Sequence, residues 1–387
     1  MATDVARLIA SGKADLLSLE DPRDPVRVLI ASLAPGGAER IVVEWLFAEA
    51  LAGRACELAV LHTRRLALKA PAGVLLLERG NRSTEDFMGA LGRRWGGACA
   101  PVSTHLIGDD LLALLWGAGL MTVPVVHNAR AGWRNDPRTW SARDVPLVVA
   151  CAGAVRAELV EVGCPMPVLT MRHRPSVASA AFDPVLRRQV RADAGIGVDT
   201  LVVLAVGAIK PQKDYPRAVA ALARLVERRD AVLVIAGGVL DDAGLAELDR
   251  VIDAASTAGV DDRLRLPGFV DPVAPWFAAA DVLLNVSRYE GLSMAVREAL
   301  AAGLPVVAID VGGQRESEEK GLTLVATDTS AADIAALLCA MPVRASLAPR
   351  AAPRLPRLWS LTLHPRRPLV EPVMTLLVTA NLNAGGA

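Results

Sequence analysis

Two glutamates eight residues apart are the side chains of this sequence best placed for chemistry. Glu290 lies in a polar turn after an apolar run, and Glu298 lies in the helical stretch that follows. A carboxylate accepts hydrogen bonds from two vicinal hydroxyls, which a ribose or a sugar offers. The amides of Gly291, Leu292 and Ser293 stand at the expected helix start, where unpaired N–H groups favour a diphosphate. This stretch indicates a site for a ligand with both phosphates and hydroxyls.

The elements that must position these residues form a strand, a turn, a helix and a second strand. Apolar runs predict buried strands at 281–286 and 304–309, and the stretch between them predicts a helix at 293–302. Apolar strands joined in this way are typical of a right-handed crossover in a parallel sheet. Ligands of such sheets bind beyond the carboxyl ends of the strands, where the turn with the first glutamate lies.

The segment from Ser287 to Glu316 resembles a known signature. It reads S-x-x-E-G-L-S-x-x-x-x-E-A-L-A-x-G-L-P-V-V-A-x-D-V-G-G-x-x-E, which is similar to the donor-site motif of retaining glycosyltransferases with the GT-B fold, of the group 1 or family 4 type. The resemblance implies that Glu290 holds the hydroxyls of the donor sugar and Glu298 the ribose of the nucleotide. Without this resemblance, the simpler interpretation would be that Glu290 caps a turn and that Glu298 lies on a solvated helix face.

Length and composition indicate two globular domains. The chain has 387 residues, of which 52% are hydrophobic and 22% charged, so each domain can bury a core. The 42 basic residues balance the 42 acidic ones. A neutral chain gives no electrostatic case for nucleic acid as a partner.

The cysteines bear on the compartment of the protein and on metal binding, and the longest apolar run bears on whether the chain crosses a membrane. The five cysteines lack metal or disulfide-framework spacing and indicate reduced thiols in a cytoplasmic protein. No metal-ligand cluster is visible, so no metal or other cofactor is expected. The longest apolar run, 111–126, is short for a membrane span and predicts a buried helix and strand. Peripheral contact with the inner face of a membrane remains compatible with this pattern.

The first domain, expected at 26–180, carries two candidate positions. A strand near residue 26 leads into Gly36 and Gly37, which permit close backbone approach to a ligand; a plain tight turn is an equally good interpretation. G-G-A-E-R at this point resembles the family's loop facing the donor phosphate and the acceptor. His127 follows the strand expected at 122–126. A lone histidine is more often structural, but V-V-H-N resembles the family's strand-end histidine, which implies that it orients the donor sugar or the acceptor.

The second domain, expected at 181–341 after a connecting segment at 182–194, carries the donor-side cation. Lys213 in the loop after the strand 201–206 would neutralise a leaving diphosphate. It matches the family's phosphate-binding lysine, although a solvated loop lysine is the alternative. The family usually places an arginine directly after the loop's glycine, where this chain has Ala208. Lys210 is the nearest substitute, with its side chain expected to point to a different face.

Two further features complete this domain and the chain. Pro267-Gly268-Phe269 resembles the family turn whose backbone meets the nucleotide base.

Outside the two domains, the sequence predicts a helical leader at 1–25 and an irregular Arg/Pro-rich tail at 342–372. Residues 373–387 resemble the opening strand and Gly-Gly loop of the first domain. They indicate the start of a second, truncated glycosyltransferase module or a join of two reading frames, with coincidence as the alternative.

Together these patterns predict two facing Rossmann-like α/β domains with a cleft between them. The function they predict is transfer of a sugar from a nucleotide-diphosphate-sugar to a hydroxyl of a saccharide, lipid-linked saccharide or other glycoconjugate, with retention of configuration. The predicted catalytic residues are His127, Lys213 and Glu290. The predicted donor-binding residues are Gly36, Gly37, Lys210, Lys213, Gly268, Phe269, Glu290, Gly291, Leu292, Ser293 and Glu298. Two alternatives remain, an impaired nucleotide-binding homologue and a nucleotide-sugar epimerase on the same fold.

Overall fold

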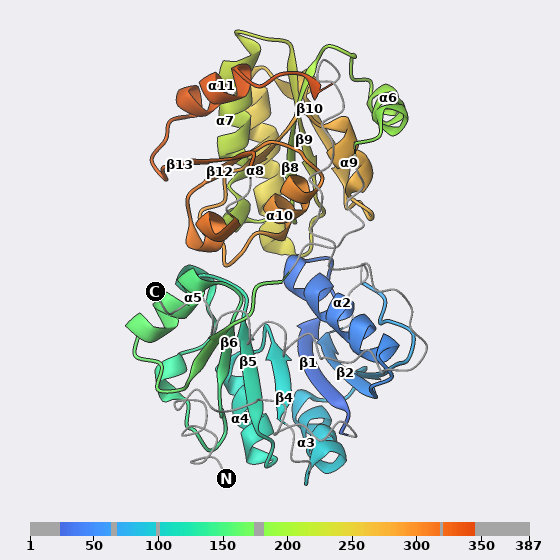
Figure 1. The fold of residues 1–387 in the computed structure, drawn as a ribbon, viewed down its shortest axis with the longest axis vertical. Helices are drawn as coiled ribbons and strands as arrows, with labels where there is room; N and C mark the ends of the chain where they lie inside the picture. The colour runs from blue at the N-terminus through green and yellow to red at the C-terminus, as the bar shows by residue number, and fades with distance from the viewer. Residues whose placement is uncertain (1–23, 63–67, 98–100, 174–181, 318–319, 345–387) are drawn as a thin grey trace, which may run out of the picture. The chain divides into compact units, whose positions relative to one another are not determined.

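The computed structural model describes residues 24–62, 68–97, 101–173, 182–317 and 320–344. They form two compact units that divide between His173 and Arg174 (Figure 1). Each unit is an α/β domain with a parallel sheet. The predicted leader up to residue 23, the tail from 345 and the predicted repeat at 373–387 lie outside the described residues.

The first unit contains a seven-stranded parallel sheet with the order β3-β2-β1-β4-β5-β6-β7. Its strands are β1 (Val26–Ser32), β2 (Cys56–His62), β3 (Val74–Glu78), β4 (Val102–His105), β5 (Thr122–Val126), β6 (Val148–Ala150) and β7 (Val168–Thr170). Its helices are α2 (Gly37–Leu51), α3 (Thr84–Trp95), α4 (Asp109–Gly117) and α5 (Gly153–Glu161), with 3-10 turns η2 (Arg130–Gly132) and η3 (Pro137–Thr139). The strand predicted at 122–126 is confirmed at both ends.

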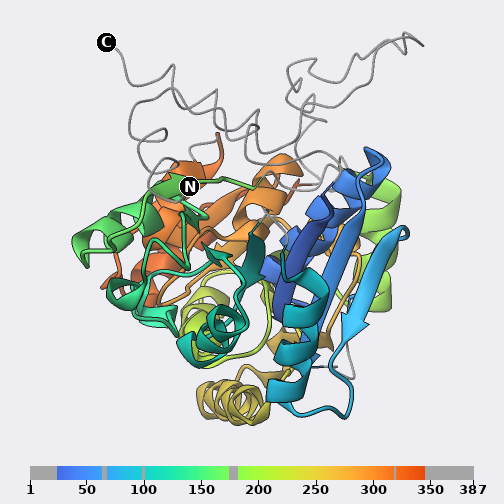
Figure 2. The same cartoon turned by 90° about the horizontal axis from the view of Figure 1, so that it is seen from below.

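Helices cover the sheet of the first unit on both faces. Helix α2 packs against β1, β2 and β3, while α3 packs against α4 (Figure 2). Right-handed crossovers place α2 on one face, because the chain moves from β1 to β2, and α4 on the other, because it moves from β4 to β5. The apolar run at 111–126 forms α4 and β5, as predicted. No helix among the described residues is long and apolar enough to cross a membrane.

The second unit contains a six-stranded parallel sheet with the order β10-β9-β8-β11-β12-β13. Its strands are β8 (Leu201–Val206), β9 (Ala231–Ala236), β10 (Leu264–Gly268), β11 (Val282–Asn285), β12 (Val306–Ile309) and β13 (Leu322–Val325). Its helices are α6 (Pro184–Asp193), α7 (Tyr215–Val226), α8 (Asp242–Ala258), α9 (Ala274–Ala279), α10 (Met294–Ala301) and α11 (Ala331–Cys339), with 3-10 turns η4 (Pro211–Lys213), η5 (Asp261–Arg263) and η6 (Gly312–Ser317).

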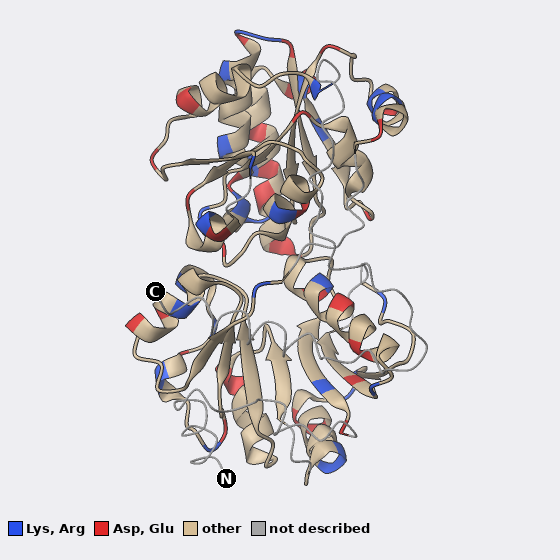
Figure 3. Ribbon diagram, in the orientation of Figure 1, with Lys and Arg blue, Asp and Glu red and all other residues tan. Residues whose placement is uncertain are grey.

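The strands of the second unit are apolar on both faces because helices cover both sides. Alternate residues of β8 enter different clusters: Val203 packs in one core and Val202 in the other. Figure 3 shows the consequence, since most charged residues lie on helices and loops and the strands are almost free of them. Strand order reverses between β8 and β11, which is where α/β sheets of this kind bind ligands.

Two segments at the edges of this unit carry buried arginines that the sequence analysis did not single out. The segment 182–194, interpreted from the sequence as a connector, contains helix α6, whose Arg187 and Arg191 are buried in the second unit. The tail predicted as irregular from 342 begins with a core residue, because Arg344 is 8% exposed. Both segments reach the same carboxylate, Asp281, at the start of β11.

Candidate functional site

The two residues predicted to handle the donor, Lys213 and Glu290, form an ion pair in the second unit. Lys213 Nζ donates to Glu290 Oε1 at 2.6 Å, and Ser287 Oγ donates to the same oxygen at 2.7 Å. Both charged side chains are largely buried, at 13% and 8% exposure. The structure therefore brings the predicted phosphate-binding lysine and sugar-binding glutamate into direct contact.

The loops that follow β8 and β11 hold this pair in place. Gln212 Nε2 donates to the carbonyl of Tyr289 at 2.8 Å, and the amide of Arg288 donates to the carbonyl of Gln212 at 2.9 Å. Because β8 and β11 are adjacent, their carboxyl ends bring both loops to one edge of the sheet. The pair lies at the point where the strand order reverses.

The charge of Glu290 depends on its neighbours. Burial alone would raise its pKa, but the Lys213 ammonium, the hydrogen bonds from Lys213 and Ser287, and the charge of Lys210 hold the pKa below its usual value. The carboxylate is therefore ionised at neutral pH and accepts hydrogen bonds. The sequence predicted that the Lys210 side chain points to a different face. Its positive charge nevertheless contributes to the lowered pKa of Glu290.

Helix α10 has its first helical residue at Met294, one residue after the predicted start at 293, which is the usual difference between definitions of a helix boundary. Ser293 is the N-cap, and its Oγ accepts a hydrogen bond from the amide of Val296 at 3.4 Å. Gly291 and Leu292 therefore precede the helix, and its first amide belongs to Met294. Serine suits this position, since a hydroxyl at the N-cap satisfies a first-turn amide. Glu298 lies within α10, as predicted, and is 7% exposed.

Close backbone packing explains the glycine after β12. Gly312 has a φ of +54°, and a β-carbon there would lie 1.7 Å from the carbonyl oxygen of Glu290. The amide of Gly313 donates to the carbonyl of Gly291 at 2.8 Å. Gly312 and Gly313, which follow β12, thus pack against the turn that carries Glu290.

We expect Gly312→Ala to weaken nucleotide binding strongly. The new methyl group would collide with the Glu290 carbonyl and displace the turn that holds its carboxylate, and φ is unfavourable for alanine as well. Titration calorimetry with nucleoside diphosphates would measure the loss. Gly303→Ala is the matched control: its φ is +69°, but no atom lies within 4 Å of the added methyl group. Equal effects from both variants would refute the packing argument.

The remaining predicted residues of this unit lie at neighbouring strand ends. Gly268 has a φ of +77° at the end of β10, and Phe269 is 37% exposed. A β-carbon on Gly238 would lie 3.1 Å from Phe269 Cβ, and one on Gly237 would lie 1.8 Å from the Gly207 carbonyl oxygen. Small residues thus bring the ends of β8, β9 and β10 together. An aromatic ring remains accessible at this edge.

In the first unit, the Gly-Gly loop caps helix α2. Gly36 is the N-cap and Gly37 the first helical residue. A β-carbon on Gly36 would lie 2.3 Å from Glu39 Oε2, so the carboxylate three residues into the helix folds back over the loop. Any larger residue would displace that carboxylate. The Gly36-Gly37 loop therefore forms the N-terminus of helix α2.

His127 lies at the end of β5 and contacts a second histidine that the sequence interpretation did not single out. Its Nε2 is 2.8 Å from Nδ1 of His105 at the end of β4. The ring of His173 stacks beside it, with 6.3 Å between ring centroids. Burial, together with the nearby His173, lowers the pKa of His127 to about 3. The imidazole is therefore neutral at physiological pH.

The predicted site residues thus form two groups, one in each unit. Lys213, Glu290 and their supports belong to the second unit, and the Gly36-Gly37 loop and His127 to the first. Among the described residues, no group of three histidines, cysteines or acids has an arrangement that could hold a metal ion.

Several supporting residues escaped sequence interpretation. Ser287 stood in the quoted motif but was given no role, and Tyr215, which donates to the Gly207 carbonyl at 2.8 Å, carried no local signal. His105 is the last residue of β4 and His127 directly follows β5, so a correctly placed end of β4 would have drawn attention to His105. Strand adjacency, which the sequence did not give, makes the two histidines neighbours.

Fold and site together define an α/β protein of the GT-B type, and comparison of the chain with known proteins agrees. HepE of Anabaena, solved in complex with UDP and glucose, aligns with a TM-score of 0.65 over 81% of this chain and 89% of its own, at 17% identity. WaaG, a glycosyltransferase involved in lipopolysaccharide biosynthesis, aligns with a TM-score of 0.64 and the same two coverages, also at 17% identity. At such identities the likeness establishes the fold.

The sequence comparisons identify the second unit more closely. Residues 200–341 match the model of the family described as glycosyl transferases group 1, the family that the motif resembles. D-inositol 3-phosphate glycosyltransferase 2 of Catenulispora acidiphila is 32% identical over 220 residues, which are 51% of each chain. A D-inositol 3-phosphate glycosyltransferase of Geodermatophilus obscurus is 30% identical over 250 residues, 58% of this chain and 56% of that one. The chain spans about half the length of these relatives.

Proposed function

We propose that this protein transfers a sugar from a nucleotide-diphosphate-sugar to an acceptor hydroxyl. The observation that carries the proposal is the buried Lys213–Glu290 pair, which lies at the strand-reversal edge of the unit that matches group 1 glycosyl transferases over residues 200–341. A buried carboxylate and a buried ammonium in contact offer an acceptor for sugar hydroxyls and a cation for phosphate oxygens.

Each part of the donor finds a matching group in the second unit. Glu298 would accept hydrogen bonds from the ribose hydroxyls, and the exposed Phe269 with the Gly268 backbone would contact the base. The diphosphate would bind Lys213, assisted by Lys210 and by the first free amides of α10. Gly291 and Leu292, which precede that helix, would contact the donor through their backbone.

The proposed chemical step exchanges one C–O bond for another. The acceptor oxygen forms a bond to the anomeric carbon while the bond from that carbon to the diphosphate breaks. The acceptor's proton ends on the released nucleoside diphosphate or in solvent. Charge develops on the leaving diphosphate, so a fixed cation such as Lys213 stabilises the transition state more than the bound donor. We further propose that the configuration is retained, which rests on the motif alone.

The first unit would serve the acceptor and the sugar. We propose that His127, neutral at physiological pH, orients the donor sugar or the acceptor, and that the Gly36-Gly37 loop lets a ligand approach the backbone at the start of α2. The relatives' names point to a phosphorylated inositol as the first acceptor to test. UDP-sugars are the first donors to test, because HepE is solved with UDP. Cytoplasmic location, including the inner membrane face, is part of the proposal.

An impaired, binding-only protein is the competing function, and Ala208 is the feature that favours it. Lys210 acts on Glu290 electrostatically, so we propose that it supplies the second cation. We expect Lys210→Ala to weaken nucleoside diphosphate binding about tenfold, near the lower end for a hydrogen bond to a charged group. Ala208→Arg should strengthen it by a similar factor. No change in either variant, measured by calorimetry, would remove the second-cation role and favour the impaired alternative.

The transfer itself is tested by incubating the chain with UDP-, GDP- and ADP-sugars and candidate acceptors. Release of nucleoside diphosphate together with a new glycoside, lost in Glu298→Ala, would support the proposal. Conversion of the donor sugar to its epimer without an acceptor would favour the epimerase instead. Nucleotide binding without turnover with any acceptor would favour the impaired homologue.

A further inference from the structure

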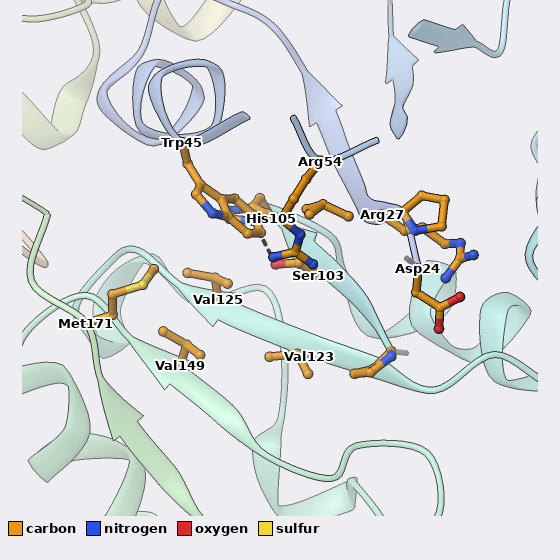
Figure 4. A pocket seen from close by; sticks show the side chains of 13 residues that line it. Asp24, Arg27, Trp45, Arg54, Ser103, His105, Val123, Val125, Val149 and Met171 are labelled. Carbon is orange, nitrogen blue, oxygen red and sulfur yellow. Dashed lines mark hydrogen bonds between the residues drawn. The ribbon is translucent and has the colours of Figure 1, made fainter. Parts of the chain in front are cut away.

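A chain of hydrogen bonds leads from Ser103 through His105 to His127 in the first unit. Ser103 Oγ lies 3.0 Å from His105 Nε2, and His105 Nδ1 lies 2.8 Å from His127 Nε2. His105 is 1% exposed, and the Trp45 ring packs beside it, with 6.2 Å between ring centroids. Figure 4 shows Ser103, His105 and Trp45 together at one side of a pocket in the sheet.

The backbone at His127 is also fixed. The thiol of Cys151 donates to the His127 carbonyl at 3.4 Å, and the indole of Trp133 donates to the Asn128 carbonyl at 2.7 Å. Because the backbone around His127 is held in this way, one hydrogen bond to the imidazole ring is enough to fix the orientation of the ring. His105 makes that hydrogen bond. Among the described residues, His127 Nδ1 has no hydrogen-bond partner. This nitrogen remains for a ligand.

The three groups also constrain each other's protons. Burial, and to a lesser degree His127 and His173, lowers the pKa of His105 well below its usual value, so both rings are neutral and each carries one proton. If Ser103 donates to His105 Nε2, His105 donates from Nδ1 to His127 Nε2, and the proton of His127 lies on Nδ1. In the reverse direction, the Ser103 hydroxyl would have no acceptor among the described residues. Each direction leaves one donor for a partner outside the chain. The first direction gives the Ser103 hydroxyl an acceptor inside the fold and leaves the Nδ1–H of His127 for the proposed ligand, and we therefore take the first.

We propose that His105 is a positioning residue that holds His127 with its proton on Nδ1, so that His127 donates a hydrogen bond to its ligand. The role of His127 toward substrate rests on the proposed function, whereas the hydrogen-bond chain does not. A ring that donates from Nδ1 can hold a sugar or acceptor oxygen. It cannot remove a proton from the acceptor, which excludes His127 as a general base.

The test is the tautomer of His127, measured by ¹⁵N–¹H correlation NMR on protein labelled at histidine. The chain has five histidines, and His127→Gln identifies the signal. At pH 7 we expect the proton on Nδ1. His105→Asn keeps an amide donor near the position of Nδ1 and should keep the tautomer. His105→Leu and Ser103→Ala remove a link and should shift His127 toward the Nε2–H form that free imidazole side chains prefer.

Two results would overturn the proposal: a proton on Nε2 in the wild-type protein, or an Nδ1–H form that persists in His105→Leu. Thermal unfolding of each variant checks that the domain is folded, and Ser103→Ala keeps the test open if His105→Leu does not fold. With a nucleotide-sugar substrate, His105→Leu should lower kcat roughly 10- to 100-fold, the range for partners that orient metal-binding histidines. His105→Asn should recover most of it. A protein that turns over no nucleotide-sugar refutes the proposed function but leaves the tautomer measurement valid.

Discussion

Lys213→Ala is expected to lower the rate of sugar transfer roughly 10²–10³-fold, the range for loss of one preorganised group that stabilises transition-state charge. The ammonium is 13% exposed and lies 2.6 Å from Glu290 Oε1. Water cannot replace it easily, so the leaving diphosphate would lose its main fixed cation. Steady-state kinetics with saturating donor measures the effect. A kcat within a factor of two of wild type would contradict the assigned role.

The same substitution should lower the stability of the second unit, and the two effects can be separated. Lys213 is a major reason that the pKa of Glu290 is lowered against the effect of burial. A lowered pKa stabilises the fold above the unfolded value and loses this contribution as pH falls through the folded pKa. In Lys213→Ala, burial dominates and raises the pKa, so the variant should lose stability as pH rises.

The control for this pair is the double variant Lys213→Met/Glu290→Gln. Replacing both charges removes the uncompensated buried carboxylate, so stability at pH 7 should recover, because removing a whole ion pair costs less than removing one partner. Activity should not recover. Urea unfolding at pH 5 and pH 7, combined with the kinetic assay, distinguishes the two. Recovery of activity in the double variant would show that Lys213 acts only on folding.

Asp281→Asn is expected to cost the second unit about 3–5 kcal/mol of stability, the usual loss when one partner of a buried ion pair is removed. One carboxylate oxygen accepts from Arg187 at 2.6 Å and from the Arg344 amide at 2.8 Å. The other accepts from Arg191 at 3.2 Å and from the Val202 amide at 2.8 Å. Asp281 is 1% exposed. Without it, the buried guanidinium groups of Arg187 and Arg191 lose the carboxylate with which both form ion pairs.

The arginines around Asp281 are buried close to one another, so their positive charges repel. Burial, together with the charge of Arg187, lowers the pKa of Arg344 to about 10. Arg187 also donates to the carbonyls of Ala278, Ala279 and Ala280 at the end of α9. Helix carbonyls at that end carry partial negative charge and offset part of the excess. The cluster therefore joins α6, β8, α9 and the chain after α11.

A matched control for Asp281 is Asp262→Asn, an exposed ion pair in the same unit. Asp262 lies 3.2 Å from Arg263 and its side chain is 76% exposed, so its loss should change stability by less than about 1 kcal/mol. Urea unfolding, with hydrogen exchange of peptides from β8 and α9 to locate the change, measures both variants. Similar costs for the two substitutions would contradict the assignment of a buried cluster.

The elements around the donor site were predictable because their signals are local. Apolar runs gave β11 and β12, and Gly303, with its positive φ, ends the helix between them as its sequence position indicates. Glu290 and Lys213 were found through a resemblance, and their contact follows from two adjacent parallel strands. Gly312 was quoted in the motif, and its close approach to the Glu290 carbonyl gives the motif a physical reason.

The rest required long-range information. Asp281 was interpreted as the first residue of a strand, since nothing nearby reveals that Arg187 and Arg344 come from segments distant in sequence. His105 gained its role only when β4 and β5 were found side by side.

The central claim is that the second unit binds a nucleotide-diphosphate-sugar through Lys213, Glu290 and Glu298. Calorimetric titration of the whole chain with UDP, GDP, ADP and their common sugar conjugates tests it most directly, with Glu298→Ala and Lys213→Ala measured beside the wild-type protein. The account predicts that one nucleotide class binds the wild-type chain and that both variants lose most of this affinity. A folded chain that binds none of these nucleotides, or one that binds equally well without the two side chains, would contradict it.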